Sequence, residues 1–108
     1  MVPLVREKLP EISALCEKFR VRKLEIFGSA SAGDFRPSSD VDFLVEFEPM
    51  TALDHYHIFF ELLDALKELL QRDVDLVEEK LLNNPYRIAN IRAQRETIFE
   101  RAHQSTAH

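Results

Sequence analysis

The chain has 108 residues, of which 45% are apolar and 31% are charged, and this balance is typical of a globular protein with one core. The net charge of −5 argues against a long nucleic-acid partner, because contacts to phosphate need a basic surface. Cys16 is the only cysteine, which excludes an intrachain disulfide. Its apolar neighbours at helical spacing favour a small buried side chain over a reactive thiol.

Cellular location and domain number follow from the same totals. No apolar run approaches the roughly 18 residues of a membrane span, and the first residues lack the apolar core of a signal peptide. We therefore expect a cytoplasmic protein without membrane contacts. We also expect residues 1–108 to form a single domain with a disordered tail over about 102–108, and no second domain that could bind an acceptor.

The first half of the chain predicts one helix and two strands. The helix begins near Pro10 and has an apolar face formed by Ile12, Leu15, Cys16 and Phe19. Anything helical before it should be a separate short turn. Residues 23–27 read as a strand that runs into a small-residue turn at 28–33, and a loop follows over 34–39. A second strand spans 41–47.

The second half predicts a long helix, a short strand and a last helix. An apolar stripe places the long helix at 53–71, and the short strand follows at 74–77. The last helix has apolar residues near one side, namely Ile88, Ile91, Ile98 and Phe99. Its basic residues, Arg87, Arg92, Arg95 and Arg101, read as a solvated face, with an acidic partner or nucleotide phosphates as the alternative. Together the elements predict a small sheet of three or four strands flanked by helices, with strand directions left open.

Asp40 and Asp42 are the first candidate site residues. They lie two apart at the start of a strand, so alternation places them on one face with Cα atoms roughly 6–7 Å apart. Two such carboxylates can bind hard cations such as Mg²⁺. Alone, the pair is more often a solvated strand face.

The Gly28-Ser29 turn raises the significance of this pair. It follows an apolar strand, where a glycine allows the backbone to approach a ligand and N–H groups at a helix start favour phosphate. A simple turn with a serine cap explains it equally well. Asp75 offers a third carboxylate within an apolar strand, where a charge needs a partner or a metal. Asp73 shares its face and remains the rival.

As a set, these residues are more specific. The chain resembles the nucleotidyltransferase superfamily that includes DNA polymerase β, and within it the MNT-type minimal nucleotidyltransferases. The segments that carry the resemblance are Gly28-Ser29, Ser39-Asp40-Val41-Asp42 and Val74-Asp75-Leu76-Val77. The resemblance covers roughly residues 12–80. It implies an α/β (α+β) fold with a small mixed sheet.

The resemblance also implies a reaction. Two Mg²⁺ ions would be bound by Asp40, Asp42 and Asp75, and Asp75 would accept the proton of the attacking hydroxyl. The triphosphate of ATP would be bound by Gly28, Ser29 and Ser39. The hydroxyl would attack the α-phosphate and pyrophosphate would leave.

One departure from the family pattern concerns an arginine. Many minimal members have Ala-Arg-Gly shortly after the Gly-Ser turn, whereas Ala32 stands at the arginine position here. Arg36 could supply the missing phosphate contact, or it could be a solvated loop charge. The rate and the nucleotide affinity depend on which of these applies.

The resemblance finally implies a partner. MNT-type proteins pair with helical HEPN proteins, where the HEPN protein is an RNase toxin and the MNT protein is the antitoxin that adenylylates it on tyrosine. Two alternatives remain: an antitoxin of the same fold that acts by binding alone, and a transferase for a small molecule or an RNA end. The intact aspartates disfavour the first alternative, and the acidic charge disfavours the second.

Overall fold

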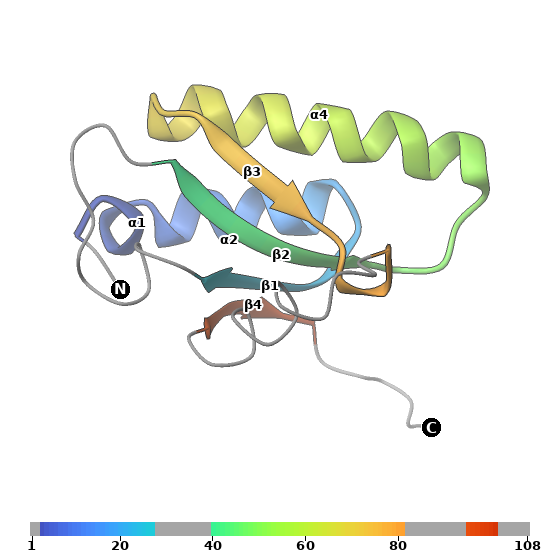
Figure 1. Ribbon diagram of the computed structural model, residues 1–108, viewed down its shortest axis with the longest axis horizontal. Helices are drawn as coiled ribbons and strands as arrows, with labels where there is room; N and C mark the ends of the chain where they lie inside the picture. The colour runs from blue at the N-terminus through green and yellow to red at the C-terminus, as the bar shows by residue number, and fades with distance from the viewer. Residues whose placement is uncertain (1–2, 28–39, 82–94, 102–108) are drawn as a thin grey trace.

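The computed structural model describes residues 3–27, 40–81 and 95–101 of the chain. Its elements are α1 (Pro3–Glu7), α2 (Leu9–Lys18), β1 (Val21–Phe27), β2 (Val41–Phe47), α4 (Ala52–Leu70), β3 (Val74–Val77), the 3-10 helix η1 (Glu79–Leu81) and β4 (Arg95–Glu100) (Figure 1). The three predicted strands and the first two predicted helices are confirmed. The short separate turn expected before Pro10 is α1.

The boundaries of α4 follow from its capping residues. The hydroxyl of Thr51 accepts a hydrogen bond from the backbone N–H of Asp54 at 3.2 Å, which satisfies one of the unpaired donors at the helix start. At the other end Gln71 adopts the left-handed conformation with φ of 55°, and its N–H donates to the carbonyl of Lys67 at 2.8 Å. The helix is therefore closed at both ends by local hydrogen bonds.

The four strands form one mixed sheet in the order β3-β2-β1-β4 (Figure 1). β1 pairs antiparallel with β2 and with β4, whereas β2 and β3 are parallel. β1 thus ends, and β2, β3 and β4 begin, at the same end of the sheet. This arrangement agrees with the expected small mixed sheet and fixes the strand directions that the sequence left open.

Within the described residues, the prediction of a last helix is wrong. Ile98 and Phe99 lie on strand β4, which pairs with β1, and Ile88 and Ile91 lie outside the described residues. Thr97, Ile98 and Phe99 are residue types that favour strands. An exposed edge of β1 was available to pair with them, so the non-local pairing outweighs the weak helical spacing.

The main core lies between the helices and one face of the sheet. It combines Ile12 and Cys16 of α2, Leu62 and Leu66 of α4, and inward residues of the strands such as Phe43, all fully buried. Phe27 and Leu44 form a smaller cluster with Val77. Strand alternation and register place these three residues on the opposite face.

Cys16 occupies the main core, as the sequence predicts. Its burial raises the pKa of the thiol to about 12, and the positive charge of Arg101 only partly opposes this effect. The thiol therefore stays protonated and unreactive near neutral pH.

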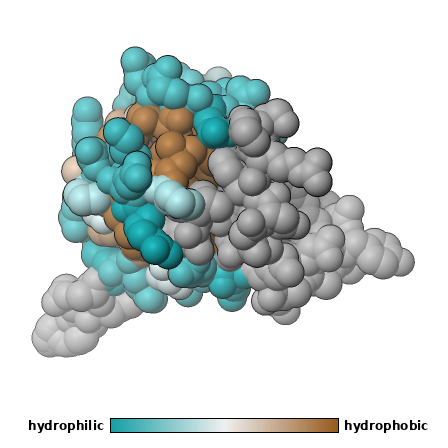
Figure 2. Space-filling model, turned by 90° about the vertical axis from the view of Figure 1, so that its left-hand side faces the viewer, coloured by the Kyte–Doolittle hydropathy of each residue, from teal (hydrophilic) through white to brown (hydrophobic). Residues whose placement is uncertain are grey.

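One end of the molecule is seen in Figure 2, which looks from the left-hand side of Figure 1. Among the residues that are coloured in this view, a patch of apolar side chains lies between polar side chains above, below and to the left. This is the end at which β1 finishes and β2 begins. In the described parts of the chain, no helix is long and apolar enough to cross a membrane.

Candidate active site

The structure brings Asp42 and Asp75 together. Asp42 on β2 and Asp75 on β3 are directly paired in the parallel register, so they lie side by side on neighbouring strands about 4.8 Å apart. Paired residues of adjacent strands present their side chains on the same face of the sheet. Both residues are half-buried. Carboxylates that are 33 residues apart in sequence thus become neighbours through the pairing of two strand starts.

The register also separates Asp75 from its rival Asp73. Asp73 precedes β3 and is exposed, and its backbone carbonyl accepts a hydrogen bond from the N–H of Val41 at 3.1 Å. Asp73 therefore helps to set the register, whereas Asp75 stands beside Asp42. The choice of Asp75 over Asp73 agrees with this geometry.

The other predicted site residues either lie outside the paired strands or fall outside the described residues. Asp40 is exposed and lies immediately before β2, at the same end of the sheet as the Asp42–Asp75 pair. Among the described residues, no three His, Cys, Asp or Glu side chains are grouped closely enough to hold a metal ion. Gly28, Ser29 and Ser39 lie outside the described residues, as does Arg36.

Asp42 and Asp75 suit Mg²⁺ by their chemistry. Mg²⁺ prefers oxygen ligands and is usually held by one or two carboxylates, with substrate phosphates completing its coordination. A pair of carboxylates from adjacent strands is such a donor set. Phe27 and Leu44 form an apolar cluster on the same face of the sheet as the two carboxylates. Apolar surroundings strengthen electrostatic interactions, because they contain less water.

A group of charged residues on β1 and β4 shares this face of the sheet. The register joins Asp75, Asp42, Phe27 and Arg95 into one row across all four strands. Arg95 forms an ion pair with Glu25, with 3.6 Å between its Nη1 and Oε1 of the carboxylate. The row thus has two carboxylates on β3 and β2 and a guanidinium on β4.

Glu25 lies at the centre of this charged group. It is only 7% exposed, its Oε2 accepts a hydrogen bond from the Thr97 hydroxyl at 3.2 Å, and Lys23 lies 3.9 Å away. Glu25 was not among the predicted site residues, and Arg95 was predicted to lie on the face of a helix. The strand-forming run Thr97-Ile98-Phe99 was the signal that could have placed Arg95 correctly.

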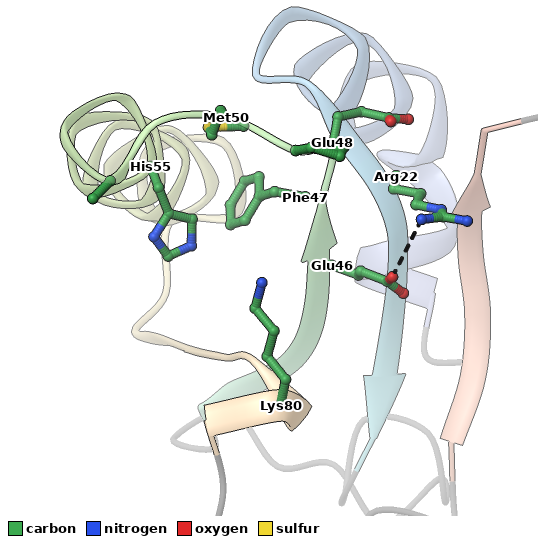
Figure 3. A pocket seen from close by; sticks show the side chains of 9 residues that line it. Arg22, Glu46, Phe47, Glu48, Met50, His55 and Lys80 are labelled. Atoms are coloured by element: carbon green, nitrogen blue, oxygen red, sulfur yellow. Dashed lines mark ion pairs between the residues drawn. The ribbon is translucent and has the colours of Figure 1, made fainter.

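A cavity of about 470 Å³ lies at the opposite end of the sheet, where β2 finishes (Figure 3). Phe47, His55 and Lys80 point toward one another there, and Arg22 forms an ion pair with Glu46 at 3.8 Å. The Nε2 of His55 lies 2.9 Å from the buried carboxylate of Glu78, which joins α4 to the segment after β3. The cavity is separate from the Asp42–Asp75 pair.

Comparison with known protein families identifies the class to which the fold and the paired aspartates belong. The nucleotidyltransferase domain family matches residues 12–98. The chain belongs to this family and is an enzyme of the nucleotidyltransferase class.

Two archaeal relatives are similar over most of their lengths. MJ0128 of Methanocaldococcus jannaschii, provisionally named a protein adenylyltransferase, is 43% identical over 72 residues, which is 67% of this chain and 70% of the relative. The protein adenylyltransferase MntA of Thermococcus cleftensis is 41% identical over 70 residues, or 65% of this chain and 68% of the relative.

Solved structures share the fold. One described provisionally as a minimal nucleotidyltransferase has a TM-score of 0.62 and 30% identity over 85% of this chain and 90% of the other. A toxin–antitoxin complex with AMP-PNP has a TM-score of 0.67 and 22% identity, over 86% and 73% of the two chains. An AMPylated HEPN toxin of Shewanella oneidensis with its MNT antitoxin gives 0.56 and 18%, over 89% and 72%.

Proposed function

We propose that this chain is an antitoxin that transfers AMP from ATP, with Mg²⁺, to a tyrosine hydroxyl of a HEPN-type RNase toxin. The observation that supports this most is the direct register of Asp42 with Asp75. This register brings together two carboxylates that suit Mg²⁺, at the end of the sheet where β1 ends, and Gly28-Ser29 directly follow β1 in the sequence. The names of the two archaeal relatives and of the complex from Shewanella oneidensis support the acceptor class.

The proposed reaction assigns a role to each aspartate. Asp40, Asp42 and Asp75 would hold two Mg²⁺ ions, which would supply positive charge to stabilise the negative charge that develops during transfer. Gly28, Ser29 and Ser39 bind the triphosphate. The tyrosine oxygen forms a bond to the α-phosphorus while the bond to the β-phosphate oxygen breaks, and pyrophosphate leaves. Asp75 accepts the phenolic proton.

Modification of this kind has a clear physical effect on an RNase. It adds a phosphodiester negative charge and a bulky adenosine to a phenol that was neutral. Beside an RNA-binding site, the added charge repels the phosphate backbone and the added volume blocks access. Transfer of AMP would therefore inactivate the toxin even after the two proteins separate.

The outer face of α4 is a docking surface suited to such a partner. Leu53, Tyr56 and Phe60 are 67%, 60% and 47% exposed, and their spacing of three and four residues forms one apolar stripe. Asp54 and Asp64 are exposed beside this stripe. An RNA-cleaving partner carries basic side chains, so we expect an apolar groove with a basic rim to bind here. A second copy of this chain would meet its own acidic rim.

Co-expression with a HEPN-type toxin tests the transfer. The intact mass of the toxin should increase by one or more AMP groups with the native chain and remain unchanged with Asp42→Asn, because the loss of one carboxylate weakens Mg²⁺ binding. Glu11→Gln, which removes an equal charge from the exposed surface of α2, is the matched control and should keep full transfer.

Three outcomes would contradict the proposal or part of it. A stable, inhibited complex without added mass in any sample would identify an antitoxin that acts by binding alone. Full transfer by Asp42→Asn would remove Asp42 from the proposed metal site. Transfer to a small molecule or an RNA end, with the toxin unmodified, would identify a different acceptor class.

A further inference from the structure

We propose that the cavity at the end of β2 binds a small aromatic molecule with one carboxylate, and that the Lys80 ammonium pairs with that carboxylate (Figure 3). Asp42 and Phe47 are five residues apart on β2, so the cavity begins about 17 Å from the aspartate pair. The proposal therefore goes beyond AMP transfer and does not depend on it. The volume of about 470 Å³ lies within the usual range for small-molecule sites, which is about 300–1,000 Å³.

The apolar part of the lining comes from the end of β2 and the residues that follow it. Phe47, Pro49 and Met50 contribute to it. The Phe47 ring makes edge contacts with the rings of His55 and Phe59, with centroids 5.4 Å and 6.4 Å apart, which restrict its position. Aromatic rings and thioethers both pack favourably against a further aromatic ring. This part of the lining therefore suits a planar aromatic group.

The carboxylates at or beside the cavity already lie close to basic side chains. The three contacts are Glu46 with Arg22 at 3.8 Å, Glu48 with Arg101 at 3.3 Å and Glu78 with His55 at 2.9 Å. These contacts connect β1, β2, α4 and the segment after β3, so the polar part of the lining is held by the folded chain.

Lys80 is the charged residue of the lining that these contacts do not include. It is exposed, and its side chain extends toward Phe47 and His55 (Figure 3). Over residues 3–27, 40–81 and 95–101, no carboxylate forms an ion pair with its ammonium group. A ligand carboxylate can therefore pair with Lys80 without displacing a carboxylate of the protein.

The glutamates of the lining determine how much charge the ligand can carry. Glu46 and Glu48 would repel a second negative charge, because like charges at short range are unfavourable. A dianion such as a nucleoside monophosphate is therefore disfavoured. A cationic ligand is disfavoured too, because it would meet the Lys80 ammonium. A single carboxylate on an aromatic ring system satisfies both conditions.

The test is a nuclear magnetic resonance titration of the ¹⁵N-labelled full chain near neutral pH. Indole-3-acetate, tryptophol and tryptamine share one ring system and carry a negative charge, no charge and a positive charge. Indole-3-acetate should shift the amide signals of the lining residues with a dissociation constant in about the millimolar range, as is usual for so few atoms. Its affinity should exceed that of the other two about threefold or more, which is the contribution of a partly exposed ion pair.

Lys80→Gln should lower the affinity for indole-3-acetate about threefold or more, to that of tryptophol, and should leave the affinity for tryptophol unchanged. Lys67→Gln is the matched control. Lys67 is also exposed, and it lies 12 residues beyond His55 on α4, which corresponds to about 18 Å. Its substitution should not change either affinity. Both variants should keep the dispersed amide spectrum of the native chain, since both side chains are exposed.

Three results would overturn the proposal. The first is that indole-3-acetate leaves the signals of the lining residues unchanged. The second is an equal affinity for indole-3-acetate in the native chain and in Lys80→Gln. The third is that AMP, added without Mg²⁺, shifts these signals at lower concentrations than indole-3-acetate does, which would identify a nucleotide site instead. AMP transfer to a toxin is tested separately by intact mass, so these results leave the proposed function standing.

Discussion

Arg101 shows how one side chain can have a role that its local sequence does not indicate. The sequence favoured a solvated helix face, but the Arg101 guanidinium donates to the carbonyl of Val21 at 3.1 Å and to the carboxylate of Glu17 at 2.9 Å. It also lies 3.3 Å from the carboxylate of Glu48. Arg101 thereby joins the end of β4 to α2 and to the start of β1.

We expect Arg101→Ala to lower the free energy of unfolding by about 1–2 kcal/mol. Hydrogen bonds to charged groups contribute about 1.5–3 kcal/mol, and the 31% exposure of this side chain reduces that value through solvent screening. Urea denaturation measures the change. Lys67→Ala, which removes an exposed basic side chain of α4, should cost less than about 0.5 kcal/mol. Equal effects in the two variants would show that the Arg101 contacts contribute little to stability.

At the scale of elements, α4 has two apolar faces with different roles. Leu62, Leu66 and Leu70 are buried against the sheet, and this inward stripe is what the sequence identified. The outward residues Tyr56 and Phe60 have ring centroids 5.1 Å apart and remain exposed. Ile98 and Phe99, which were predicted on a last helix, instead pack against the main core from β4.

Substitution of the outward stripe tests its proposed role in toxin binding. The triple variant Leu53→Ser, Tyr56→Ser, Phe60→Ser should weaken the complex with the HEPN-type toxin about 100-fold or more, because buried aromatic anchors dominate interface energies. Its unfolding temperature should barely change, since these side chains are exposed. Leu81→Ser removes a leucine that is 66% exposed elsewhere on the surface and should leave binding intact.

Surface plasmon resonance with the immobilised toxin gives the affinities. Native affinity in the triple variant would place toxin binding on another surface. Sedimentation of the chain alone adds a second control. If the stripe instead joins two copies of this chain, the native protein should dimerise and the triple variant should not.

At the scale of the whole molecule, the candidate site depends on pairings between distant segments. β2 contributes Asp42 and β3 contributes Asp75, and the parallel pairing of the two strands places these residues side by side. A ligand that binds across these strands is bound by the folded chain alone. Ligand binding and folding are therefore thermodynamically linked.

We expect ATP with Mg²⁺ to raise the melting temperature of the native chain. At a ligand concentration 100 times Kd the stabilisation is about 2.7 kcal/mol, which for a domain of this size corresponds to a rise of roughly 10 °C or more. Differential scanning fluorimetry measures the shift. It should disappear with EDTA and in Asp42→Asn. A shift of equal size without Mg²⁺ would mean that the nucleotide binds independently of the proposed metal site.

Local patterns in the amino-acid sequence were enough to predict several helices and strands and the class of enzyme. Helical spacing identified α2 and α4, alternation and strand-forming residues identified β1, β2 and β3, and the motif around Asp40, Asp42 and Asp75 indicated the class of enzyme. These signals are contained in windows of a few residues, because the periods of helices and strands are short.

The strand pairings and the contacts between distant segments could be seen only in the three-dimensional structure. Ile98 and Phe99 were predicted on a helix because of their spacing, but they lie on a strand that pairs with β1. The hydrogen bond between Thr97 and Glu25 joins residues 72 positions apart. The register of Asp42 with Asp75 likewise depends on how β3 aligns with β2. Such pairings are set by which strand edges are available and which faces are buried, and no local window of sequence contains that information.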